Sequence, residues 1–310
     1  MTFKMGALPR SKDVAVPRLS DHLNLDTVGS TAGVPWAGTV AVDRQSKVSA
    51  FPMYLNDTLG DCTCAGMGHA VAQWTAYSGK VEGGAQFADS VIEALYTSVS
   101  GYNPETGADD NGAELYQVCD QMISTGIKDT AGNVHKIAGY CDVSDFSTLA
   151  RLKDILNAFG TVYLGVAVGD AEQNAFSAGQ PWTLEKAGPN VGPDGIDHCV
   201  VMSYSAVNVA GATDNETLVT WGGEARFNEN WGCQNIGEAI AVFSQDWLDA
   251  AGDSPIGQAA QAIVAELATL PRSTVNPSKI PAAATLSMPR CPFCGLTFGT
   301  CHHSQGVNPV

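Results

Sequence analysis

Helix-type patterns occupy the first half of this 310-residue chain, and strand-type patterns occupy the second half. Apolar residues recur at helical spacing in the segments 62–78, 87–102, 109–127 and 145–160. β-Branched and aromatic residues then gather in the short runs 161–169, 197–207, 216–222 and 238–244. Helices and strands that are segregated along a chain are typical of an α+β fold. We therefore expect a helical lobe followed by a sheet or barrel lobe.

Capping signals define the ends of two of these helices. Asp61 is a suitable N-cap for the helix 62–78, and Gly79 is a suitable stop. In the helix 109–127, Asn111 is followed three residues later by Glu114, which resembles a capping box.

The main domain is expected to span residues 51–250. Residues 1–50 have proline-rich, irregular character, with no clear helical or strand period. Residues 251–290 contain an amphipathic helix at 255–270 and then a Pro/Ala-rich linker. A short cysteine- and histidine-containing tail, residues 291–310, ends the chain.

Composition excludes several classes of protein. Hydrophobic residues make up 45% of the chain and charged residues 15%, which is typical of a globular protein. The formal charge of −16 repels phosphate backbones, so we expect no nucleic-acid partner. No apolar run suits a membrane helix or a secretory signal, so we expect no membrane partner. We expect a location in the cytoplasm of a bacterium or infected host cell, with association with a virion as the alternative. The nine cysteines are scattered, so most should be thiols or metal ligands in a reduced compartment.

Two cysteines lie where a glycine-rich turn meets the first helix. Cys62 falls in the first turn of that helix, where the helix dipole lowers the pKa of a thiol. Cys64 lies roughly 200° further around the helix axis, so the two thiols face different directions. Taken alone, this turn favours two ordinary buried thiols. His198, at the start of the strand 197–207, supplies the partner that a nucleophilic cysteine needs.

The order of these motifs resembles that of the papain-like cysteine peptidases. Asn56 stands six residues before Cys62, as an oxyanion-hole glutamine does in that family. Three further stretches resemble the family's cleft turn, histidine strand and Asn-Ser-Trp-Gly motif, and these are DNGA (110–113), DHCVV (197–201) and VTWGG (219–223). The resemblance covers about residues 50–247 and implies a two-lobed papain-like fold of a divergent, bacterial or phage type.

The resemblance also implies a role for each matching residue. Cys62 is then the nucleophile, and His198 takes its proton and returns it to the leaving amine. The Asn56 side chain and the Cys62 backbone N–H would bind the oxyanion, and Trp221 would shield the histidine from water. The residues expected to contact a peptide or protein substrate are Asn111 and Gly112. Catalysis of this kind needs no cofactor.

One departure from the family concerns the residue that orients the histidine. Val219 stands in the place of the family's asparagine and cannot accept a histidine N–H. Thr220 is a substitute if the strand register shifts by one, and Asn228 or Asn230 could fold back instead. Losing the orienting residue usually costs rate, without abolishing activity.

Two hypotheses follow from this departure. The first is an active cysteine peptidase or amide hydrolase. The second is a catalytically impaired papain-like fold that serves as a structural or binding protein, such as a phage virion or assembly component. Val219 favours the second hypothesis, and the spacing of Asn56 and Cys62 favours the first.

Two other features have a plainer structural interpretation. His69 lies on the same helical face as Cys62, but a base on the helix of its own nucleophile is rare, so we expect a core or helix-face residue. The acidic stretch 103–114 lacks the spacing of an EF-hand. We therefore expect a solvated loop and helix cap there, in preference to a calcium site.

The chain ends in a pattern typical of a zinc knuckle. Cys291 and Cys294 form a CxxC-Gly turn that points two thiolates at one metal ion. Cys301 and His303 complete a set of four ligands. We expect this tail to hold a structural zinc ion and to be able to dock a protein partner. The alternative is a disordered tail with reactive thiols.

Metal analysis of the purified full chain and of the Cys291→Ser variant tests the zinc site. We expect about one zinc ion per wild-type chain and a loss of zinc in the variant, because three ligands leave a structural site open. Absence of zinc from both proteins would contradict the prediction.

Overall fold

The computed structural model describes residues 3–12, 15–22, 40–146, 148–210, 216–251, 261 and 264–265. The expected linker and the zinc-knuckle ligands Cys291, Cys294, Cys301 and His303 lie outside these residues, as does most of the expected helix 255–270. No helix of the described residues is long and apolar enough to cross a membrane.

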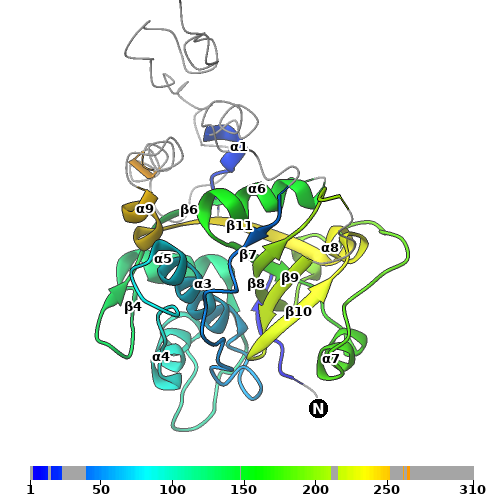
Figure 1. The fold of residues 1–310 in the computed structure, drawn as a ribbon. Helices are drawn as coiled ribbons and strands as arrows, with labels where there is room; N and C mark the ends of the chain where they lie inside the picture. The colour runs from blue at the N-terminus through cyan, green and yellow to red at the C-terminus, as the bar shows by residue number, and fades with distance from the viewer. Residues whose placement is uncertain are drawn as a thin grey trace, which may run out of the picture.

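Helices dominate the first half of the described chain and strands the second half, which confirms the α+β expectation (Figure 1). The helices are α1 (Leu19–His22), α3 (Cys62–Ser78), α4 (Asp89–Ser100), α5 (Leu115–Ser124), α6 (Leu149–Phe159), α7 (Asp170–Ser177), the 3-10 helix η2 (Pro193–Gly195), α8 (Glu229–Asn235) and α9 (Gln245–Ala251). The strands are β1 (Ala7–Leu8), β2 (Val42–Asp43), β3 (Ala113–Glu114), β4 (Ile127–Lys128), β5 (Val134–His135), β6 (Ile137–Asp142), β7 (Val162–Val166), β8 (His198–Ser205), β9 (Glu216–Thr220), β10 (Gly223–Phe227) and β11 (Ile236–Ser244).

A seven-stranded antiparallel sheet forms the second half of the fold. Its strand order is β10-β9-β8-β7-β11-β6, and β2 also pairs with β8. Strands β2, β6 and β10 of this sheet were not expected from the sequence. Figure 1 shows α3, α4 and α5 grouped together beside the strands.

The sheet separates two hydrophobic cores, because successive side chains of a strand point to opposite faces. On β8, Val200 and Met202 enter the core that contains α6, whereas Cys199 and Val201 enter the core that contains α3. Both faces of the sheet are therefore covered by helices.

Helix α3 matches the predicted helix 62–78 at both ends. Every residue from Cys62 to Ala76 is buried, as in a helix that is enclosed on all sides. Gly79 ends the helix in the left-handed conformation with φ of 74°. Asp61 precedes the helix but makes no side-chain capping hydrogen bond.

Helix α5 begins later than the sequence suggested. Glu114 is its N-cap, and the Gln117 side chain accepts a hydrogen bond from the Glu114 N–H at 3.0 Å. The prediction that Asn111 caps this helix is therefore wrong. The true capping box is shifted by three residues, because Ala113 and Glu114 are extended in strand β3.

Residues 3–12, here called the N-terminal segment, are extended and form strand β1. This strand pairs in parallel with β3, with Ala7 opposite Ala113. Phe3 lies beside α7, since the Phe3 N–H donates to the Gln173 side chain at 2.8 Å. The segment is therefore attached to the domain despite its irregular composition.

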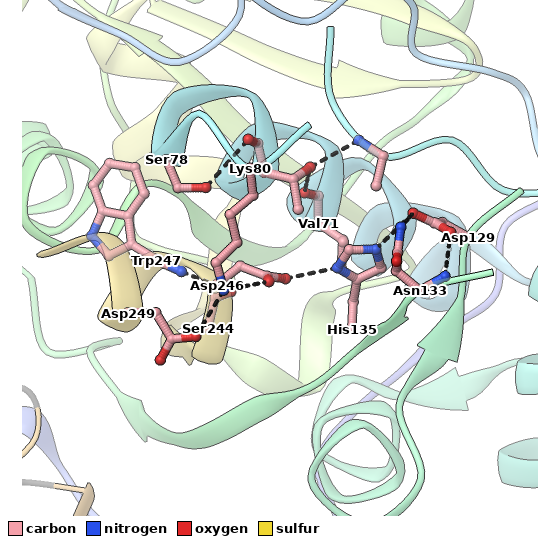
Figure 2. Close-up of polar contacts among 12 residues, drawn as sticks. Val71, Ser78, Lys80, Asp129, Asn133, His135, Ser244, Asp246, Trp247 and Asp249 are labelled. Atoms are coloured by element: carbon pink, nitrogen blue, oxygen red, sulfur yellow. Dashed lines mark hydrogen bonds and ion pairs between the residues drawn. The ribbon is translucent and has the colours of Figure 1, made fainter. Parts of the chain in front are cut away.

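A buried histidine joins separate parts of the chain (Figure 2). His135 is 4% exposed, and its Nδ1 lies 2.8 Å from Asp246 of α9 while its Nε2 lies 3.1 Å from Asp129. Lys80, just after α3, pairs with Asp246 at 3.1 Å and with Asp249 at 2.7 Å. Burial alone would lower the pKa of His135, but the two carboxylates outweigh burial and raise that pKa. The His135 imidazole thus fastens α9 to the turn between β4 and β5.

We predict that His135→Asn lowers the free energy of unfolding by about 3 kcal/mol, because two buried carboxylates each lose one of their partners. The pKa of His135 is higher in the folded chain. Its protonation therefore stabilises the fold fully below the unfolded pKa of about 6.5, and this stabilisation is lost as the pH rises through the folded pKa. Denaturant unfolding at about pH 5.5 and about pH 8.5 should show the larger loss at the lower pH. A loss of equal size at both would contradict the ion-pair assignment.

Candidate functional site

The Cys62 thiol lies at the first residue of α3 and is only 1% exposed. Burial raises the pKa of Cys62 to about 12, although peptide groups of Cys199, Gly6 and Thr63 face the sulfur and oppose the rise. The thiol is therefore neutral at ordinary pH in this structure. The contact with the Cys199 peptide group places Cys62 beside the start of strand β8.

His198 opens strand β8 and is fully buried. Its Nε2 lies 2.6 Å from the Thr220 hydroxyl, and its ring stacks on Trp221 at a centroid distance of 4.6 Å. Its Nδ1 makes no hydrogen bond to any described residue, so it makes none to the Cys62 thiol. Burial lowers the pKa of His198 to about 3, so the imidazole is neutral. One ring nitrogen is thus held, and the other remains available.

Thr220, not Val219, contacts the histidine. Val219 lies opposite Val201 and points into the core that contains α3, so it faces away from His198. The register of β8 and β9 shifts between Met202 and Tyr204. The two asparagines considered as substitutes are used elsewhere, because Asn228 caps α8 through Trp231 N and Asn230 donates to Leu184 and Glu185 carbonyls.

Trp221 occupies an unfavourable backbone conformation. Trp221 and Gly222, with φ of 44° and 73°, form the two-residue turn between β9 and β10. Such turns need positive φ at both central positions and prefer asparagine or glycine there. A left-handed tryptophan costs about 1–2 kcal/mol, which must be offset by its contacts. His198 stacks on it, and Phe3 stacks on it at 4.5 Å with an interplanar angle of 9°.

Asn56 lies near Cys62 but is engaged with a second side chain. Its amide donates to the Asp61 carboxyl at 3.2 Å, and both residues are buried. Burial raises the pKa of Asp61 to about 8, with the Asn56 hydrogen bond opposing. Asp61 is therefore largely protonated at neutral pH, and any negative charge on it would raise the pKa of the Cys62 thiol further. Sequence reasoning considered Asp61 only as a cap.

The N-terminal segment passes beside Cys62 between the sheet and the helices. Gly6 N donates to the Asp197 carbonyl at 3.1 Å, and Ala113 N donates to the Gly6 carbonyl at 2.9 Å. A Cβ at Gly6 would lie 1.9 Å from the Gly60 carbonyl oxygen, so a side chain does not fit there. This contact explains why the thiol is covered, and the sequence analysis did not predict it.

The two residues expected to bind substrate lie in the turn that the segment contacts. Asn111 is exposed, whereas Gly112 is buried with φ of 90°. A Cβ at Gly112 would lie 2.2 Å from the Gly6 carbonyl oxygen. Glycine is needed here for both its backbone conformation and the close approach of the segment.

Asp110 organises the turn before Cys62. Its Oδ1 accepts hydrogen bonds from Gly60 N at 2.9 Å and from the Tyr96 hydroxyl at 2.7 Å, and Lys4 pairs with its Oδ2. Burial would raise the pKa of Asp110, but these donors outweigh it and lower that pKa. Asp110 is thus an ionised part of the fold.

The described residues contain no group of three or more potential ligands that could hold a metal ion.

The remaining thiols and histidine of α3 belong to the core. Cys64 is fully buried in the same core as Cys62. The His69 ring is 2% exposed, stacks on Tyr54, and its Nε2 lies 2.7 Å from the Pro52 carbonyl oxygen. Burial lowers the pKa of His69 to about 4. These contacts agree with the expectation that His69 is a core residue.

Solved structures of cysteine proteases share this architecture. Xylellain, a cysteine protease from Xylella fastidiosa, gives a TM-score of 0.50 at 11% identity, covering 78% of this chain and 98% of its own. Procathepsin B S9 from Trypanosoma congolense gives 0.49 at 9% identity, over 78% and 87% of the two chains. Digestive procathepsin L 3 of Tenebrio molitor larval midgut gives 0.48 at 15% identity, over 71% and 77%. The likeness to xylellain confirms the papain-like fold. No family model and no curated protein matches the chain.

We predict that Asp61→Asn stabilises the folded protein by an amount that grows between about pH 4 and about pH 8. The folded chain holds the Asp61 proton up to about pH 8, whereas the unfolded chain releases it near 3.8. The wild type therefore loses stability as the pH rises through this window, and an amide has no proton to lose. Thermal unfolding of both proteins across the window measures the difference. A constant difference would show that Asp61 does not titrate as described.

Proposed function

We propose that this chain, on its papain-like fold, is a cysteine-type amide hydrolase that acts on peptides or proteins through Cys62 and His198. One observation carries the proposal. A cysteine at the N-terminus of a buried helix lies beside strand β8, and the histidine that opens this strand is held at 2.6 Å by Thr220. The acidic surface favours basic substrate segments.

Thr220 selects the useful tautomer of the histidine. When Nε2–H donates to the Thr220 hydroxyl oxygen, Nδ1 carries the lone pair and can act as the base. Nδ1 is the nitrogen that has no partner among the described residues. Stacking on Trp221 fixes the plane of the ring and excludes water from it.

The reaction then follows the roles of the residues. His198 Nδ1 takes the thiol proton of Cys62, and the sulfur attacks the substrate carbonyl carbon. The C–N bond breaks, the amine leaves with that proton, and a thioester remains on Cys62. Water then attacks the thioester carbonyl carbon and gives a proton to His198. The C–S bond breaks, the carboxylic acid leaves, and His198 returns the proton to the Cys62 sulfur.

The oxyanion would be bound by the Cys62 backbone N–H and by Asn56. The Asn56 amide has two N–H donors, and only one of them is used by Asp61. A protonated Asp61 keeps negative charge away from the oxyanion. Asp61 therefore helps the site most below about pH 8.

A second candidate function is that of a papain-like binding or structural protein without catalysis, such as a virion or assembly component. Two observations favour it. The Cys62 thiol is buried with a pKa raised to about 12, and it makes no hydrogen bond to His198 in the described residues. We rank this function second because a hydrogen bond with Thr220 orients the His198 imidazole, and packing alone would not require that hydrogen bond.

Hydrolysis of a mixed peptide library, followed by mass spectrometry, tests the proposal. We expect cleavage by the wild type, and loss of cleavage in Cys62→Ser and His198→Ala. Thr220→Val should lower kcat by about tenfold or more and shift the pH profile, because the histidine loses its orienting partner.

Cys233→Ser is the matched control, since Cys233 is a free, half-buried cysteine in α8 outside the site. It should cleave as the wild type does. Cleavage that survives in Cys62→Ser would exclude the hydrolase and favour the binding protein. Absence of cleavage from the wild type and from Cys233→Ser, under conditions in which a thiol reagent modifies Cys62, would do the same.

A further inference from the structure

We propose that His69 is a positioning residue for the oxyanion site, because it holds the turn 53–56 in a strained backbone conformation and so fixes the place of the Asn56 carboxamide. The inference rests on the proposed function for its catalytic consequence, since Asn56 is assigned there to the oxyanion. The hold on the turn itself is made by contacts and can be measured without catalysis.

The turn 53–56 has a backbone conformation that bulky side chains disfavour. The Asn56 N–H donates to the Met53 carbonyl at 3.1 Å, and the two residues between them, Tyr54 and Leu55, have φ of 55° and 69°. Positive φ at both central positions is typical of a type I′ turn, which prefers asparagine and glycine there. Two consecutive large residues with positive φ persist only where surrounding contacts hold them.

Helix α3 supplies such contacts through His69, seven residues after Cys62. A carbonyl oxygen can only accept, so the His69 Nε2–H donates to the Pro52 carbonyl at 2.7 Å, directly before the turn. The ring stacks on Tyr54, inside the turn, at a centroid distance of 5.2 Å. Burial lowers the pKa of His69 to about 4, so the imidazole is neutral above that pH and keeps this single N–H donor.

The next residue back along α3 makes room for the turn. Tyr54 is 1% exposed, and a Cβ at Gly68 would lie only 3.0 Å from the Tyr54 ring. Gly68 and His69 therefore act on the same side chain, since the glycine admits the tyrosine ring and the histidine stacks on it.

The turn 53–56 also touches the turn that carries Trp221. A Cβ at Gly222 would lie 3.2 Å from the Met53 backbone nitrogen. One turn thus carries Asn56, and the other carries the tryptophan that stacks on His198. A shift of the turn 53–56 would move the oxyanion donor relative to the histidine, which makes its position important for catalysis.

Peptide hydrolysis by full-length His69→Ala and His69→Gln tests the catalytic consequence. We expect His69→Ala to lower kcat by about tenfold or more, because an oxyanion donor that is out of place no longer stabilises the transition state. KM should change by less than about twofold, since the lost hydrogen bond is made only in the transition state. His69→Gln should restore most of kcat, because its carboxamide can donate to the Pro52 carbonyl.

Val71→Ala is the matched control for a loss of buried volume in α3. Val71 is 1% exposed and lies roughly 200° around the helix axis from His69. It should hydrolyse peptides as the wild type does. Alkylation of Cys62 by iodoacetamide forms no oxyanion, so its rate should be the same in His69→Ala and in the wild type. Equal losses of kcat in Val71→Ala and His69→Ala would indicate general packing and overturn the inference.

Leu55→Gly provides a second test that depends on the strain. Glycine adopts positive φ at no steric cost, so the turn then needs less support from His69. His69→Ala should therefore lower kcat less in the Leu55→Gly protein than in the wild type, as a double-mutant cycle would show. Equal losses in both proteins would contradict the inference.

Backbone hydrogen exchange reads the turn without catalysis. The N–H groups of Asn56, Thr58 and Leu59 are bonded to nearby carbonyls at 3.1, 2.8 and 2.9 Å. We expect their exchange to become about tenfold faster in His69→Ala but not in His69→Gln or Val71→Ala. Unchanged exchange in His69→Ala would overturn the inference. Faster exchange there, with no peptide hydrolysis by the wild type, would support the hold on the turn and reject the hydrolase.

Discussion

The complete enclosure of helix α3 is the constraint on which the site depends. Because Cys62 to Ala76 are all buried, the groups at the start of the helix are removed from water together. Desolvation disfavours charge, so it raises the pKa values of Cys62 and Asp61 and lowers that of His198. Cys62, Asp61 and His198 are therefore largely neutral near pH 7. Any chemistry between Cys62 and His198 begins with a proton transfer between neutral partners.

The alternation of β9 explains how the histidine is held. Adjacent strand residues face opposite cores, so Val219 supports α3 while Thr220 reaches His198. Two consecutive residues of β9 thus have different tasks, since Val219 packs in the core and Thr220 makes the hydrogen bond to His198. The hydroxyl of Thr220 is shorter than a carboxamide, and the bulged register of β8 and β9 accompanies its contact with the imidazole.

Local patterns were sufficient to predict much of the fold. The ends of α3 follow from a continuous apolar run and from Gly79, and β7, β8, β9 and β11 follow from β-branched runs. The residues Cys62, His198, Thr220 and Trp221 were named as candidates from motif order. What the sequence did not reveal depends on non-local contacts. The path of residues 3–12, the pairing of Asn56 with Asp61 and the role of Asp110 arise only when distant segments meet. The one local signal was a basic N-terminus on an acidic chain, which indicates attraction but not position.

Three stacked rings run from the start of the chain to the site. Phe3 lies on Trp221 at 4.5 Å, and Trp221 lies on His198 at 4.6 Å. Trp221 stays in this column although its backbone turn would be better served by asparagine or glycine. The orientation of the histidine therefore depends on a turn and on the third residue of the chain. A substitution at either place should disturb the imidazole, even though these residues are far apart in the sequence.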